Sequence, residues 1–190
     1  NRIFRGRTER KSVNTGVMVM LDQSSSMGNI KDSATKAAMA VAYALGNTPG
    51  VKLSVAGFSS QYAYVDGRQI YQPYVKPMKG FNERLNEKDF VADAAGGTPM
   101  AEALWWSASE LLGLNGIERR ILLVVTDGDP DCSHSTIDIR KKMESAGIEV
   151  KAIGINHIIS KHLIPDNCTI NNIAELPNKL FGMLQDSLIG

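Results

Sequence analysis

The sequence predicts an α/β domain with a doubly wound, mostly parallel sheet of about six strands, one antiparallel edge strand, and helices on both faces. Short, continuously apolar and β-branched runs alternate along the chain with Ala-rich or amphipathic helical patterns. This alternation is typical of βαβ units. The pair Asp66-Gly67 lies between β-prone flanks and indicates a hairpin, which supplies the antiparallel edge.

Size, charge and cysteine content limit the class of protein. The chain has 190 residues, of which 43% are hydrophobic and 22% charged, and its formal net charge is +1. One domain of this size can bury a sufficient core without disulfides. The charge favours neither nucleic acid nor an anionic membrane as a partner, and no apolar run is long enough to span a bilayer. No signal peptide is visible, and two cysteines are too few for a secreted disulfide framework, so we expect a cytoplasmic protein.

The first half of the chain is predicted to begin with an arm. Residues 1–15 are basic and have no hydrophobic period, so the domain proper is expected to cover 16–190. The hairpin is expected within 61–78, where Pro73 and Pro77 favour an edge position. The other elements expected here are a buried strand at 16–22, an Ala-rich helix at 29–46, a strand at 51–59 and a short helix within 83–94.

The second half continues the alternation. A helix is expected at 98–113, with Thr98 as its N-cap and Pro99 in its first turn. Of its adjacent Trp105 and Trp106, one is expected in the core and the other partly exposed. The remaining expected elements are an apolar strand within 119–131, a helix at 135–147, a strand at 148–155, a short helix at 156–164, a short strand at 168–173 and a helix at 176–189.

Oxygen-bearing side chains gather where predicted strands end. Asp22, Ser24 and Ser26 follow the first strand at alternate positions, Asp127 ends the most apolar strand, and Thr98 opens a helix. Ligands of such sheets bind at the carboxyl ends of the strands, near the point where strand order reverses. Mg²⁺ prefers six oxygen ligands, and this set would leave a coordination position open. We therefore predict a divalent metal site at these five residues, with Mg²⁺ as the ion and Mn²⁺ or Ca²⁺ as alternatives.

Simpler interpretations remain open for single residues. Ser, Thr and Asp after a strand are also ordinary helix N-caps, and Thr98 taken alone fits a cap better than a ligand. Asp129 and Asp131 could orient metal-bound water or be solvated loop carboxylates, and the second interpretation is favoured for Asp131. Cys132 and His134 lack the spacing of a zinc site. The sequence contains no nucleophile elbow, P-loop or dinucleotide-binding glycine pattern.

The motifs resemble those of the von Willebrand factor A (VWA) domain. The run "DQSSS" matches its D-x-S-x-S pattern, and Thr98 in "GGTP" and Asp127 in "TDGD" match the other positions of its metal-ion-dependent adhesion site (MIDAS). One departure is Ser25, where Gly is common. The stretches "LDQSSSM", "GGTPMAEALWW", "ERRILLVVTDGDPD" and "LPNKLFGML" are similar to the C-terminal VWA region of the CobT subunit of aerobic cobaltochelatase.

The resemblance implies a function in protein binding. It implies that a partner's Asp or Glu completes the coordination of the metal, and that the domain works with an AAA+ ATPase of the MoxR or CobS type, as in cobalt insertion during cobalamin biosynthesis. The domain would then be a non-catalytic subunit. The alternative from another class is a metal-assisted phosphoesterase that uses the same acidic cluster, although such enzymes usually gather more carboxylates around two metals.

Overall fold

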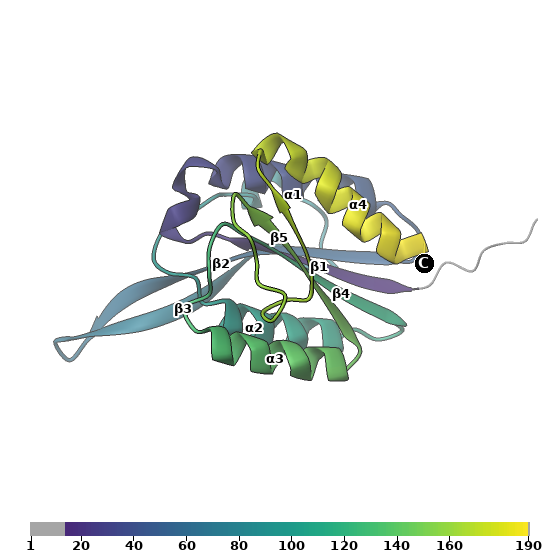
Figure 1. Cartoon of the computed structure of the whole chain (residues 1–190). Coiled ribbons are helices and arrows are strands. Elements are labelled where there is room, and N and C mark those ends of the chain that lie inside the picture. The colour runs from purple at the N-terminus through teal and green to yellow at the C-terminus, as the bar shows by residue number, and fades with distance from the viewer. Residues whose placement is uncertain (1–13, 190) are drawn as a thin grey trace, which may run out of the picture.

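A six-stranded sheet forms the centre of the molecule, in the order β3-β2-β1-β4-β5-β6 (Figure 1). The computed structural model describes residues 14–189. Every strand pairing is parallel except that of β2 with β3. The strands are β1 (Thr15–Asp22), β2 (Val51–Val65), β3 (Arg68–Lys79), β4 (Arg119–Thr126), β5 (Ile148–Ile155) and β6 (Asp166–Ile170). The predicted fold class is confirmed.

Helices cover both faces of the sheet, as predicted: α1 and α4 on one face, α2 and α3 on the other (Figure 1). They are α1 (Lys31–Gly46), α2 (Met100–Leu112), α3 (Ser133–Ser145) and α4 (Leu176–Ile189), with short 3₁₀ turns η1 (Ser25–Asn29), η2 (Glu87–Asp89) and η3 (Ile173–Glu175). Among the described residues, none of the helices combines the length and hydropathy that a bilayer-spanning segment requires.

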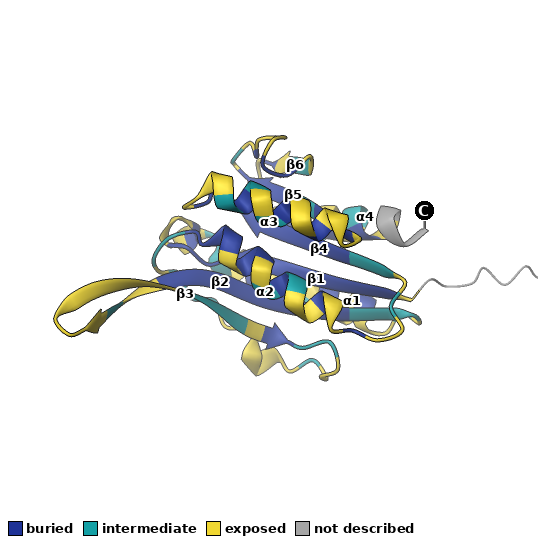
Figure 2. Ribbon diagram, turned by 90° about the horizontal axis from the view of Figure 1, so that it is seen from below, coloured by how far each residue is buried: buried dark blue, intermediate teal, exposed yellow. Residues whose placement is uncertain are grey.

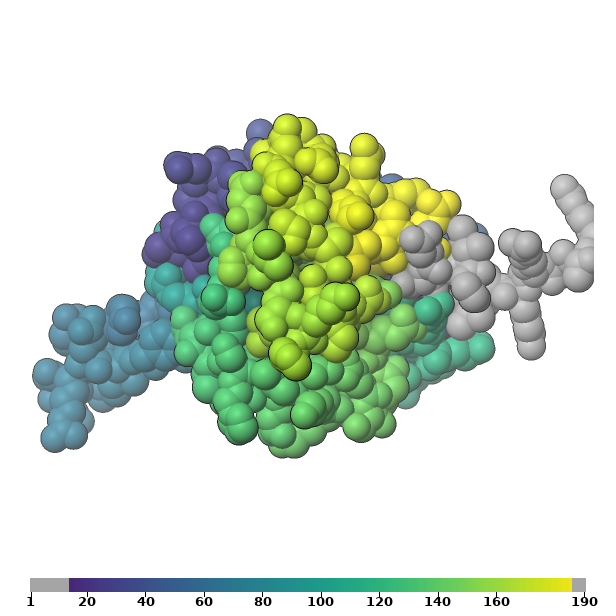
Figure 3. Space-filling model, viewed as in Figure 1, coloured from purple at the N-terminus to yellow at the C-terminus, as the bar shows by residue number. Residues whose placement is uncertain are grey.

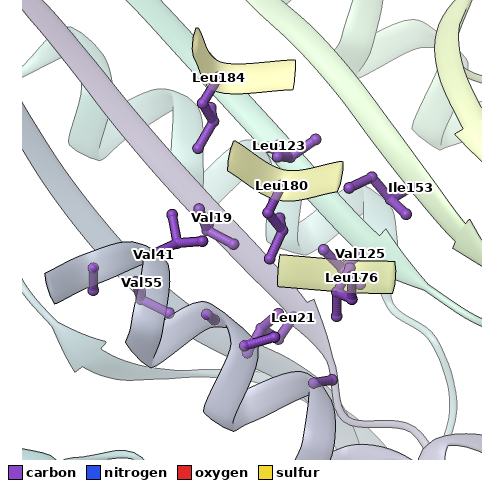
Figure 4. Packing of buried hydrophobic residues seen from close by; sticks show 14 of the residues in the cluster. Val19, Leu21, Val41, Val55, Leu123, Val125, Ile153, Leu176, Leu180 and Leu184 are labelled. Carbon is purple, nitrogen blue, oxygen red and sulfur yellow. The ribbon is translucent and has the colours of Figure 1, made fainter. Parts of the chain in front are cut away.

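Two hydrophobic cores lie on either side of the sheet because side chains alternate along each strand. On one side, Leu176, Leu180 and Leu184 of α4, spaced four residues apart, pack over strand residues such as Val19 and Leu123 (Figure 4). On the other side, α2 and α3 cover the remaining side chains of the same strands, including Met18 and Leu122. Trp105 is exposed and Trp106 is half-buried against this second core, so the expected difference between them is present but neither side chain is fully in the core.

The strands β2 and β3 extend beyond the sheet as a hairpin, which we call the hairpin arm (residues 60–73). It projects from the body of the molecule (Figures 1 and 3), and its side chains are mostly exposed (Figure 2). Asp66 and Gly67 both have positive φ, of 51° and 74°, as a type I′ turn requires. The strand expected at 51–59 and the first hairpin strand are one continuous strand, because no turn residue interrupts them.

The prolines of β3 lie at the outer edge of the sheet, as predicted. Pro73 pairs with Ser60 and Pro77 with Ala56. A proline has no N–H, so it fits only where the backbone nitrogen points away from the partner strand. The outward positions of β3 along this stretch are therefore Tyr71, Pro73, Val75 and Pro77, and two of the four lack a donor.

Several predicted boundaries need correction. The N-cap of α2 is Pro99 and not Thr98, whose side chain caps nothing. Residues 156–164 form no helix, and the helix expected within 83–94 is reduced to η2, since Asn86 caps only one short turn. The arm expected at 1–15 lies mostly outside the described residues, but Thr15 is buried in β1 and bonds through its N–H to the carbonyl of Gly50 at 2.8 Å.

Candidate metal site

The predicted site lies where the order of the sheet reverses. From β1 the chain goes through α1 to β2 on one side, and it later returns through α2 to β4 on the other side. The strands β1 and β4 are parallel neighbours, so their carboxyl ends meet at one edge. Asp22 is the last residue of β1, and Asp127 directly follows β4. Their positions therefore follow from topology, as expected for a doubly wound sheet.

Asp22 is held in a buried position by two hydrogen bonds. Its Oδ1 accepts the backbone N–H of Ser24 at 2.8 Å, and its Oδ2 accepts the hydroxyl of Thr126 at 2.6 Å. Only 1% of the residue is exposed. The carboxylate thus has a fixed orientation, and the sequence did not indicate that Thr126 helps to fix it.

Two serine hydroxyls connect the carboxylates of the site. The hydroxyls of Ser24 and Ser26 are 3.0 Å apart, and the hydroxyl of Ser26 donates to Oδ1 of Asp127 at 2.7 Å. The turn η1 begins at Ser25, whose backbone N–H donates to the carbonyl of Gly96 at 3.1 Å. A continuous series of hydrogen bonds therefore runs from Asp22 to Asp127, and the backbone N–H of Ser24 makes its first link.

Burial raises the pKa of Asp22 above its ordinary value of 3.8. The hydrogen bonds from Thr126 and Ser24 act in the opposite direction, and the negative charge of Asp127 adds to the rise. Desolvation and a nearby like charge both disfavour the ionised form of a carboxyl group. A divalent cation between the two carboxylates would relieve both effects.

Thr98 reaches the site on a glycine-rich loop. Gly96 has a φ of +66°, and a Cβ there would lie 1.9 Å from the carbonyl oxygen of Ser60, so only glycine fits. The Gly96 carbonyl accepts both the N–H and the hydroxyl of Ser25 at 3.1 Å, which joins this loop to η1. Thr98 is buried, and its hydroxyl makes no hydrogen bond with another described residue. Thr98 lies at the same edge, but its side chain makes no hydrogen bond with the other four residues.

Asp131 is an exposed loop carboxylate, as the favoured interpretation expected, but it also has a structural role. Its Oδ1 accepts the backbone N–H of Thr98 at 2.9 Å, and its Oδ2 accepts the hydroxyl of Tyr71 from β3. This bond, together with burial, raises the pKa of Tyr71 to about 12, with burial the larger cause. The sequence could not show this, because Tyr71 and Asp131 are 60 residues apart.

Gln23 is a second residue that sequence reasoning missed. It stands between two predicted ligands, is 1% exposed, and packs its amide over Gly57 of β2. Neither Oε1 nor Nε2 has a hydrogen-bond partner among the described residues. A buried amide without partners is destabilising.

Other polar groups near the edge do not form a competing site. The ring Nε2 of His157 lies 3.2 Å from Oδ1 of Asp129, and both Cys132 and Cys168 are free thiols. In the part of the chain that the structure describes, no three His, Cys, Asp or Glu side chains gather to hold a metal. A cation at this edge would therefore depend on hydroxyl ligands.

The five residues fit a hard cation. They supply two carboxylates and three hydroxyls, all oxygen donors of the kind that Mg²⁺ and Mn²⁺ prefer. Four of them are joined in the chain of contacts from Asp22 to Asp127, and Thr98 is held beside them by Ser25 and Gly96 through the backbone. A bound ion there would act as a Lewis acid toward an anionic oxygen.

Comparison with known proteins identifies structures that have a similar fold. No protein-family model matches this sequence, and no curated protein sequence matches it significantly. Among solved structures, a von Willebrand factor type A protein from Catenulispora acidiphila has a TM-score of 0.69 at 18% identity, over 93% of this chain and 43% of that chain. The proximal thread matrix protein 1 from the mussel byssus, with a zinc-occupied MIDAS motif, has a TM-score of 0.68 at 20% identity, over 89% and 46%.

A third structure, the manganese-loaded TRAP protein of Plasmodium vivax, has a TM-score of 0.63 at 14% identity, over 91% of this chain and 72% of that chain. The chain therefore has the VWA fold, and its structural neighbours include one protein with zinc in a MIDAS motif and one that is manganese-loaded. It spans only 31% of the pilus adhesin SpaC from Lactobacillus rhamnosus GG and 46% of the mussel protein. The likeness concerns the domain and not those whole proteins.

Proposed function

We propose that this domain binds Mg²⁺ through Asp22, Ser24, Ser26, Thr98 and Asp127, and that the bound ion captures an Asp or Glu side chain of a protein partner. The observation that carries the proposal is the chain of contacts from Asp22 through Ser24 and Ser26 to Asp127, at the switch point of the sheet. Zinc and manganese in structures of similar fold support a divalent ion at this position.

An anionic oxygen is the ligand that such an ion would select. The set supplies five oxygen ligands, so an ion that prefers six keeps one coordination position open. The edge around the site is formed by loops that carry Ser25, Ser26 and Asp127, which are at least partly exposed. A carboxylate on a protein surface can therefore approach the ion without a deep cavity.

The partner we propose is an AAA+ ATPase of the MoxR or CobS type, in a complex resembling cobaltochelatase. The similarity of four sequence stretches to the CobT subunit supports this finer proposal. The domain then acts as a non-catalytic subunit, and cobalt is the cargo of the complex rather than the resident ion. The unpaired cysteines agree with the cytoplasmic location that this proposal includes.

The alternative, a metal-assisted phosphoesterase, has less support. Two-metal hydrolases bring together more carboxylates than hydroxyls. Within residues 14–189 the required group of three acidic or imidazole side chains is missing. Phosphatase assays with Mg²⁺ and Mn²⁺ separate the two functions, because hydrolysis that disappears in Asp22→Asn would favour the enzyme.

The test of the proposed function has two parts. Calorimetric titration with Mg²⁺ should show one site in the wild type and none in Asp22→Asn. Size-exclusion chromatography with a purified CobS-type ATPase, in Mg²⁺ and ATP, should then show a complex that EDTA or Asp22→Asn prevents. Metal binding without a complex would reject the chelatase-like partner while keeping the metal site.

A further inference from the structure

One carboxylate joins the hairpin arm to a predicted metal ligand. Asp131 holds Thr98 at both of its backbone polar groups, since its Oδ1 accepts the N–H at 2.9 Å and its own N–H donates to the Thr98 carbonyl at 3.0 Å. The other carboxylate oxygen of Asp131 accepts the hydroxyl of Tyr71 on β3. The position of Thr98 therefore depends on Asp131, and that of Asp131 on the arm.

The base of the arm makes a second contact with the loop that carries Thr98. The hydroxyl of Ser60 in β2 accepts the N–H of Gly97 at 2.7 Å. A Cβ on Gly97 would lie 2.7 Å from Oδ1 of Asp131, and one on Gly96 would meet the backbone of Ser60. The loop at 96–98 is thus enclosed between Ser60 and Asp131, so a shift of the arm would move it.

We propose that Asp131 and Tyr71 are positioning residues of the metal site, and that cation binding and the conformation of the hairpin arm are coupled through them. This inference rests on the proposed function, because it requires Thr98 to be a ligand. Groups that orient a ligand from behind alter metal affinity without touching the metal. The coupling is reciprocal, so the ion must also stabilise the arm.

The coupling matters because the arm carries an exposed aromatic surface. Tyr62 and Tyr71 are cross-strand partners with ring centroids 6.0 Å apart, and Tyr64 lies two residues farther along the same face. Their exposed fractions are 59%, 38% and 74% for Tyr62, Tyr71 and Tyr64. Tyrosine is favoured in protein interfaces. A shift of Tyr71 within this face would move Asp131 and hence change the affinity of the metal site.

The test measures Mg²⁺ affinity of the whole chain by calorimetry. Tyr71→Phe removes only the hydroxyl, which bonds to Asp131 and also contacts the side chain of Ser60. We expect it to weaken Mg²⁺ binding by about 3- to 10-fold, less than the roughly 10- to 100-fold typical for losing a group that bonds directly to a metal ligand. The matched control is Tyr64→Phe, which removes a hydroxyl from the same face that makes no hydrogen bond with a described residue. It should leave the affinity unchanged.

A double-mutant cycle tests whether Tyr71 acts through Thr98. Thr98→Val keeps the shape of the residue and removes its hydroxyl. In that background Tyr71→Phe should change the remaining affinity by less than about 2-fold, because the ligand it positions is gone. An equal loss in both backgrounds would overturn the inference, and so would wild-type affinity in Tyr71→Phe.

Hydrogen exchange gives a readout in the arm itself. Mg²⁺ should slow amide exchange at residues 60–72 in the wild type, and slow it less in Tyr71→Phe. Unchanged exchange in the wild type at saturating Mg²⁺ would contradict the coupling while the metal site stands. No Mg²⁺ binding by the wild type would instead reject the proposed function, and this inference with it. Melts in EDTA confirm that each variant is folded.

Discussion

Replacing Asp22 by Asn and by Ala separates its charge from its hydrogen bonds. In Asp22→Asn, the amide oxygen can accept the Ser24 N–H, and the amide nitrogen can donate to the hydroxyl of Thr126. The Thr126 hydroxyl can in turn donate to the carbonyl of Gly128, which lies 3.1 Å away. Asn therefore removes the buried charge and keeps the bonds, whereas Ala leaves the Ser24 N–H without its acceptor.

The two variants should differ in stability without metal. Losing the acceptor of a buried N–H costs about 1 to 3 kcal/mol, so Asp22→Ala should melt several degrees below Asp22→Asn in EDTA. Asp22→Asn should melt at or above the wild type, because burial disfavours the wild-type carboxylate. Mg²⁺ at 100 times its dissociation constant stabilises the wild type by about 2.7 kcal/mol. For a chain of this size that is about 5 to 10 °C, and neither variant should show it.

The pH dependence of the melting temperatures in EDTA gives an independent check on the burial of the Asp22 carboxylate. The folded pKa of Asp22 is raised, so between 3.8 and that raised value the native state binds more protons than the unfolded state. The free energy of unfolding of the wild type therefore rises as the pH falls through this window. The difference in melting temperature by which Asp22→Asn exceeds the wild type should shrink toward pH 3.8. The reasoning is refuted if Asp22→Asn keeps the Mg²⁺ shift, or if it melts as low as Asp22→Ala in EDTA.

Three further predictions concern the loop at Gly96, the buried amide of Gln23 and the two cysteines. Gly96→Ala should destabilise the fold by more than about 2 kcal/mol in urea unfolding, because its Cβ would meet Ser60 and its φ is positive; a neutral result would mean that the loop can move away. Gln23→Met should raise the melting temperature, since it replaces two unpartnered buried atoms with apolar ones, and a lower value would show that the amide is satisfied. Iodoacetamide should modify Cys132 before Cys168, because a hydrogen bond from Ser135 lowers the pKa of the exposed Cys132 thiol while burial raises that of Cys168; mass spectrometry that finds the reverse order would contradict this.

The fold was largely predictable because its strands differ sharply from their surroundings. The run at 148–155 is β-branched and alternates with helices, and it forms β5 with the predicted bounds. The helix at 176–189 likewise has its predicted bounds, since Leu176, Leu180 and Leu184 recur every four residues. The helix predicted at 156–164 was wrong. Its apolar residues Ile159, Leu163 and Ile164 are buried, but they reach the core from a loop and not from one face of a helix.

The site was predictable only in part. Asp22 and Asp127 could be found because each follows an apolar strand, and parallel neighbours end at the same edge. The contacts of Asp131 with Thr98 and Tyr71 depend on how far the hairpin reaches across that edge. No local pattern encodes such a distance, so only the three-dimensional structure shows it. Whether the five residues bind a cation stays a prediction.

The two prolines at the outer edge of β3 have a consequence for solubility. An edge strand with a complete row of outward N–H groups is a template on which another chain can add a strand, the first step toward fibrils. The hairpin arm exposes Tyr64, Val65 and Ile70, side chains that favour such growth. Pro73 and Pro77 remove two of four outward donors from the adjoining edge. The outer edge of β3 beside the body of the molecule is therefore a poor template for strand addition, while the hairpin arm that continues from it still displays exposed aromatic side chains.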